Sequence, residues 1–175
     1  MKKSVMAALG GVMTALSLLL LQLGAVVWLL AYIMPLLCGI LMIAVYHSAG
    51  GKTVLLIYAA VSILSLILLN DKECALLYVL FFGYYPLLRE KLTAVGNRIL
   101  RFLIKLAVFN AGVVAAELLC VYVFGIPFDL FLGKWSALVL LLCANLVFVI
   151  YERLLSMLTV IYVKKYKPRL DKYFK

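Results

Sequence analysis

The stretch VMAALGGVMTALSLLLL, residues 5–21, has no charged side chain and decides the fold class. A helix needs roughly 20 mostly apolar residues to cross the hydrocarbon layer of a membrane, and somewhat fewer when flanking residues reach its surface. Five further apolar stretches follow along the chain: Tyr32–Tyr46, Thr53–Leu69, Cys74–Leu88, Phe102–Phe124 and Trp135–Tyr151. We therefore predict an all-α integral membrane protein, a bundle of six transmembrane helices.

The composition supports this class. Apolar residues make up 68% of the 175 residues, whereas soluble domains have about half. No linker or low-complexity segment divides the chain, so residues 1–175 are expected to form a single transmembrane domain. The net charge of +10 needs no nucleic-acid partner, because basic loops facing anionic lipid account for it.

The distribution of Lys and Arg predicts the orientation. If the gaps between the six stretches are assigned alternately to the two membrane faces, fifteen of the seventeen basic residues fall on one face. Only Lys72 and Lys134 fall on the other. Short loops rich in Lys and Arg stay cytoplasmic, so we expect a multi-pass protein of the cell membrane with both termini inside. The basic tail, residues 164–175, is suited to bind anionic lipid; a solvated tail with no specific role is equally compatible.

Catalytic and metal-binding motifs are missing from the sequence. There is no H-E-x-x-H, no G-x-G-D and no P-loop, and His47 is the single histidine. The four cysteines show no C-x-x-C spacing. Cys38, Cys120 and Cys143 lie inside apolar stretches, where small packing residues are common, and Cys74 is the first residue of another. We therefore expect neither an enzyme nor a cofactor or metal site.

A stripe of small residues marks the first stretch. Ala7, Gly11 and Ala15 recur every four residues, which places them on one helix face where another helix can approach closely in lipid. This favours docking to a partner protein. Packing inside the bundle is the alternative, since a second small-residue stripe occurs at residues 107–115.

Polar groups within the stretches are the next candidates. Glu117 and Asn110 are seven residues apart on one helix face, and Asn145 is expected at mid-membrane in the last stretch. Ionisable residues inside a membrane usually mark a substrate or ion route, although Glu117 could also be a paired structural residue. Glu152 is expected to pair with Lys105 near the cytoplasmic face in a structural role.

Aromatic residues could complete a binding site. Tyr78 and Phe82 are one helical turn apart and could stack on a planar ligand, but packing is the simpler interpretation. Trp28 and Tyr32 belong to an uncharged connection around Gln22 and Gly24, which we expect to fold over the outer face like a lid. A carboxylate, two amides and a phenol under such a lid would suit a small ligand with an amine or several N–H donors.

Taken together, six helices, internal termini, the stripe at Ala7, Gly11 and Ala15 and a lid-like first loop resemble the substrate-binding S component of energy-coupling factor (ECF) transporters. The resemblance implies that the first helix docks to a transmembrane scaffold subunit driven by ATPase subunits. It also implies that a vitamin-sized nutrient binds near the outer face. The corresponding substrate-binding candidates are Trp28, Tyr32, Tyr78, Phe82, Asn110, Glu117 and Asn145.

Two other functions remain open. A non-transporting scaffold that organises partner membrane proteins is the main alternative, and a lipid-acting enzyme is a more distant one. The buried carboxylate of Glu117 favours substrate capture, because a scaffold has no need of it. The residues do not identify the nutrient.

Overall fold

The computed structural model describes residues 3–27, 30–125 and 136–166, and this part of the chain contains helices and no strands. Three long helices come first: α1 (Lys3–Val26), α2 (Ile33–Ala49) and α3 (Gly51–Leu68). Trp28, Lys134, Trp135 and the tail beyond Tyr166 lie outside the described residues, and with them part of the expected lid and most of the basic tail.

The second half is built around a broken helix. α4 (Lys72–Leu77) continues into a π-helix, η2 (Tyr78–Phe82), and α5 (Tyr85–Leu92) follows after a turn. The two long helices α6 (Arg98–Tyr122) and α7 (Ser136–Ile161) complete the bundle, and a second π-helical turn, η4 (Tyr162–Tyr166), extends α7.

The structure agrees with a helical membrane protein. Among the described residues, four helices are long and apolar enough to cross a membrane; they are Ser4–Val26, Gly51–Leu68, Arg98–Tyr122 and Leu138–Lys165. α2 is apolar but has only 17 residues. The stretch Cys74–Leu88, predicted as one helix, is divided among α4, η2 and α5. Six crossings and the orientation of the termini therefore remain proposals.

The first helix is longer than expected. We predicted that it ends at Leu21 and that Gln22 and Gly24 form the following connection, but α1 continues to Val26. Gly24 lies inside the helix at a point of close approach: a Cβ atom there would be 3.0 Å from Met34 Cβ and 3.1 Å from Cys74 Sγ. The glycine lets α1 pack tightly against α2 and α4.

Local signals in the sequence determine the helix ends. Asp71 caps α4, since its carboxylate accepts hydrogen bonds from the backbone N–H groups of Glu73 (3.0 Å) and Cys74 (3.4 Å). Asn97 caps α6 in the same way. Gly50 separates α2 from α3 with a φ of +83°, a conformation that glycine adopts readily.

The bundle has two hydrophobic cores. The first joins α1, α2 and α3 to the start of the broken helix and is mainly aliphatic. The second is rich in aromatic residues and joins η2 and α5 to α6 and α7. Because the broken helix contributes to both cores, it holds the two halves of the bundle together.

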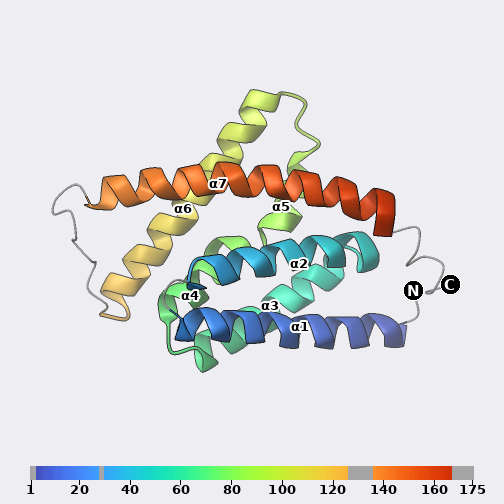
Figure 1. Ribbon diagram of the computed structural model, residues 1–175, viewed down its shortest axis with the longest axis horizontal. Coiled ribbons are helices and arrows are strands. Elements are labelled where there is room, and N and C mark those ends of the chain that lie inside the picture. Colours follow the sequence, from blue (N-terminus) through green and yellow to red (C-terminus); the bar gives the residue numbers. More distant parts are fainter. Residues whose placement is uncertain (1–2, 28–29, 126–135, 167–175) are drawn as a thin grey trace.

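Figure 1 shows that α1 begins and α7 ends on the same side of the molecule. We call this side the Gly50 end, after the turn between α2 and α3, and the opposite side the Asp71 end. α6 crosses α7 at a steep angle, and the two helices diverge toward the Asp71 end (Figure 1). This divergence creates the space described next.

Candidate ligand cavity between α6 and α7

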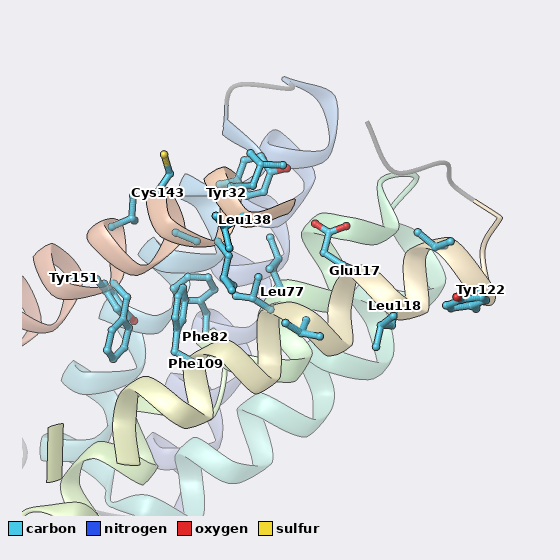
Figure 2. Close-up of a pocket in the computed structure, with 18 residues that line it drawn as sticks. Tyr32, Leu77, Phe82, Phe109, Glu117, Leu118, Tyr122, Leu138, Cys143 and Tyr151 are labelled. Carbon is cyan, nitrogen blue, oxygen red and sulfur yellow. The ribbon is translucent and has the colours of Figure 1, made fainter. Parts of the chain in front are cut away.

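A cavity of about 940 Å³ lies between α6 and α7 and is bounded on its inner side by Leu77 and Phe82 of the broken helix. Small-molecule sites in proteins typically measure roughly 300–1,000 Å³. Figure 2 shows the residues that line it. Most are aliphatic or aromatic, and Glu117 is the single charged residue among those described.

Aromatic rings form the deep end of the cavity. Phe109 of α6 and Phe148 of α7 stack on each other with ring centroids 4.7 Å apart and an interplanar angle of 17°. Phe82 meets Tyr151 edge to face at 5.4 Å. We call these four residues the aromatic floor. They lie where α6 crosses α7, so they close the space between the diverging helices.

Glu117 and Tyr32 line the part of the cavity nearest the Asp71 end, which we call the mouth. Glu117 projects from α6 on the side where Tyr32 lies, away from Phe82 and Phe109 (Figure 2). Among the described residues, Glu117 has no hydrogen-bond or ion-pair partner. The hydroxyl of Tyr32 donates a 2.5 Å hydrogen bond to the carboxylate of Glu73. Burial and this bond raise the pKa of Tyr32, and the charges of Glu117 and Asp71 raise it further.

The two amides predicted for the site lie together but outside the cavity lining. Asn110 Nδ2 donates to Asn145 Oδ1 (3.0 Å), and Asn145 Nδ2 donates back to Asn110 Oδ1 (2.9 Å). Each amide also donates to the carbonyl oxygen four residues earlier, of Leu106 and Leu141 respectively. With these bonds made, the pair links α6 to α7 and offers little to a ligand.

Tyr78 is also placed elsewhere. It is fully buried and packs against Tyr58 of α3, with ring centroids 6.2 Å apart. Its hydroxyl has no hydrogen-bond partner within the described part of the chain. Of the predicted substrate-binding residues, Tyr32, Phe82 and Glu117 line the cavity, whereas Tyr78, Asn110 and Asn145 do not. Trp28 is outside the described residues.

Sequence reasoning missed Glu73 and most of the aromatic floor. Glu73 was visible as an acidic residue at the start of a helix, but its proximity to Tyr32 depends on how α2 packs against α4. Phe109 lies two helical turns before Glu117 on the same side of α6, a spacing that could have indicated it. Tyr151 and Phe148 face the cavity only because α7 crosses α6 at this point.

A buried ionic cluster connects the helices near the Gly50 end. As predicted, the Lys105 ammonium pairs with Glu152, and the structure adds Arg89, whose Nε lies 3.3 Å from Glu152 Oε1. Tyr85 donates a 2.5 Å hydrogen bond to the other carboxylate oxygen. Arg89 Nη2 also donates to Ser156 Oγ at 2.8 Å. One carboxylate of α7 thus joins α5 and α6.

The small-residue stripe of α1 faces away from the bundle. Ala7, Gly11 and Ala15 are all exposed, and a Cβ added at Gly11 would meet no atom within 4 Å. Val12 and Leu19 beside the stripe are each 63% exposed. The opposite face of the helix, at Ser17 and Leu21, is fully buried against the first core.

No family model, curated protein or solved structure matches this chain. We therefore infer the function from the geometry of the cavity. In the described ranges, no group of three or more His, Cys, Asp or Glu side chains is arranged to hold a metal ion.

Proposed function

We propose that this protein is the substrate-capture subunit of a membrane importer, similar to the S components of ECF transporters. It takes up a vitamin-sized nutrient in the cavity between α6 and α7. The observation that carries the proposal is this cavity of about 940 Å³, apolar throughout its depth and with the half-buried carboxylate of Glu117 at its mouth. An unpartnered carboxylate inside a membrane bundle lowers the stability of the fold, and such residues usually mark a functional site.

The proposed orientation puts the mouth on the outside of the cell. The Gly50 end has the basic residues of the turns, and short basic loops remain in the cytoplasm. α1 begins and α7 ends at that same side (Figure 1). The mouth, at the Asp71 end, would then face the medium from which the nutrient comes.

Docking to a partner is the second part of the proposal. In lipid, helices associate through close packing of small residues, because apolar surface gains nothing from leaving the hydrocarbon. The exposed stripe Ala7, Gly11 and Ala15 supplies such a surface. We propose that it contacts a transmembrane scaffold subunit to which ATPase subunits are bound.

Native mass spectrometry of gently extracted protein tests capture. We expect one small molecule bound per chain in the wild type and much less in Ala144→Phe, whose larger side chain would project into the cavity. The matched control is Leu146→Phe, because Leu146 is 64% exposed on the same helix and does not line the cavity. A folded wild-type protein without any bound metabolite would favour the non-transporting scaffold instead.

A further inference from the structure

We propose that the cavity is selective for an organic monocation: a compound with a protonated amine at one end and an uncharged, aromatic or otherwise apolar body. This inference rests on the proposed function and defines the class of its substrate. It follows from the separation of charge and aromatic surface along the cavity, from the absence of basic residues among its described lining, and from the internal pairing of the nearby amides.

The mouth provides the counter-ion for the amine. Glu117 has no partner in the described part of the chain, so its carboxylate is available to a ligand. The ammonium of Lys72 is not paired with Glu117. It donates instead to the carbonyl oxygens of Leu66 (3.0 Å) and Leu69 (2.7 Å). Glu73 adds a second negative charge beside Tyr32. An ammonium entering here exchanges water for carboxylate oxygens.

The floor provides a surface for the uncharged body. Phe109 precedes Glu117 by eight residues, which places it roughly 12 Å deeper along α6, at 1.5 Å per residue. The rings of Phe82, Phe109 and Phe148 offer faces and edges on which an aromatic group can pack. A carboxylate at one end of the cavity and aromatic surface at the other fit a ligand with an ammonium at one end and an apolar body at the other.

The lining also disfavours other classes of ligand. No Lys, Arg or His is among the described residues that line the cavity, so a ligand carboxylate or phosphate would find no counter-ion among them. Asn110 and Asn145 donate to each other and to backbone carbonyls, so a sugar-like ligand would find few hydrogen-bond partners. Amino acids are disfavoured for the first reason, and polyols for the second.

A natural reporter is present in the cavity wall. Cys143 lines the cavity and is exposed, whereas Cys38, Cys74 and Cys120 are buried. The rate at which N-ethylmaleimide alkylates Cys143, followed by intact mass, therefore reports on occupancy. Three probes of matched shape differ only in charge at pH 7: 4-phenylbutylamine is a cation, 4-phenylbutan-1-ol is neutral and 4-phenylbutyrate is an anion.

We expect 4-phenylbutylamine to slow the alkylation of Cys143 at a concentration at least tenfold below that needed for the alcohol, and the acid to give no protection. A hydrogen bond to a charged group contributes enough for a difference of this size. Glu117→Gln should remove the advantage of the amine over the alcohol. Glu90→Gln, which neutralises a glutamate at the Gly50 end, should retain it.

Equal protection by the amine and the alcohol in the wild type would overturn the inference and would indicate a cavity for neutral or lipid-like molecules. This comparison needs no variant, so it stands even if Glu117→Gln does not fold. Capture itself fails separately, if the purified and folded wild type contains no bound metabolite.

Discussion

Glu152 connects more helices than any other ionisable residue described here. Its carboxylate accepts a hydrogen bond from Tyr85 of α5 and forms ion pairs with Arg89 of α5 and Lys105 of α6. Arg89 and Lys105 are only 8% and 6% exposed. Arg89 also pairs with Glu90 at 3.0 Å, whereas Glu152 is the one carboxylate that pairs with Lys105 in the described part of the chain. A buried cation that loses its counter-ion is destabilising by several kcal/mol.

We therefore expect Glu152→Gln to lower the free energy of unfolding by about 3 kcal/mol. Reversible unfolding in mixed detergent micelles measures the change. Glu117→Gln is the matched control and should not lower the free energy of unfolding, because Glu117 has no partner within the described ranges. A Glu152→Gln protein as stable as the wild type would show that the cluster is solvated and does not hold the helices together.

The sequence predicted some residues of the ionic cluster around Glu152 and some residues of the cavity. The pairing of Lys105 with Glu152 followed from their similar depth in consecutive spans. Arg89 was counted only among the basic residues of the predicted cytoplasmic face, because the sequence did not show how α5 packs against α7. Asn110 and Asn145 were expected to face a ligand, but their amides bond to each other. Spacing along the sequence shows which face of a helix a residue occupies, but not which neighbouring group forms its hydrogen bonds.

Close helix packing is visible at Gly39 of α2. A Cβ added there would lie 2.2 Å from Tyr151 Oη and 3.0 Å from the carbonyl oxygen of Phe82. Glycine thus allows α2 to touch both α7 and the π-helix beside the aromatic floor. The hydroxyl of Tyr151 is buried and has no hydrogen-bond partner in the part of the chain described.

We expect Gly39→Ala to lower the free energy of unfolding by about 1–3 kcal/mol through overpacking. Adding Tyr151→Phe should restore most of the loss, because it removes the atom nearest to the new Cβ. Gly11→Ala is the control and should be neutral or slightly stabilising, since that site is open and alanine favours helix. Thermal melts of the wild type, the two single glycine variants and the double variant measure these differences. A Gly39→Ala protein as stable as the wild type would contradict the tight contact.

The broken central helix shows the limit of sequence reasoning about elements. The stretch Cys74–Leu88 is apolar and long enough to suggest one straight helix, and only Pro86 indicated a break. The π-helix at Tyr78–Phe82 depends on packing: Gly112 of α6 approaches so closely that an added Cβ would be 3.0 Å from the carbonyl oxygen of Leu80. Hydrophobicity along the chain contains no information about such contacts.

For the whole molecule, the orientation can be measured directly. Asn70 and Lys52 are exposed near opposite ends of α3. In a cysteine-free background, we expect Asn70→Cys to react with a membrane-impermeant maleimide added to intact cells. Lys52→Cys should react only after the cells are opened, because the proposed orientation places its basic turn in the cytoplasm. The reverse pattern would place the mouth of the cavity inside the cell and exclude nutrient capture from the medium.

The small-residue stripe of α1 is the proposed docking surface for a partner protein. We expect Gly11→Leu to abolish co-purification with a membrane partner while the isolated protein remains folded, because leucine would prevent close approach of another helix. Leu56→Phe on α3 is the control, since Leu56 is 72% exposed on a different face. If the partner still co-purifies with Gly11→Leu, the stripe is not the docking surface.

The central claim is that the cavity captures a nutrient for import, and comparative mass spectrometry of spent growth medium tests it most directly. We predict that cells producing the wild type or Leu146→Phe deplete an amine-bearing compound that remains in the medium of cells producing Ala144→Phe. Equal amounts of every medium component in all three cultures, with comparable protein in the membranes, would contradict the account.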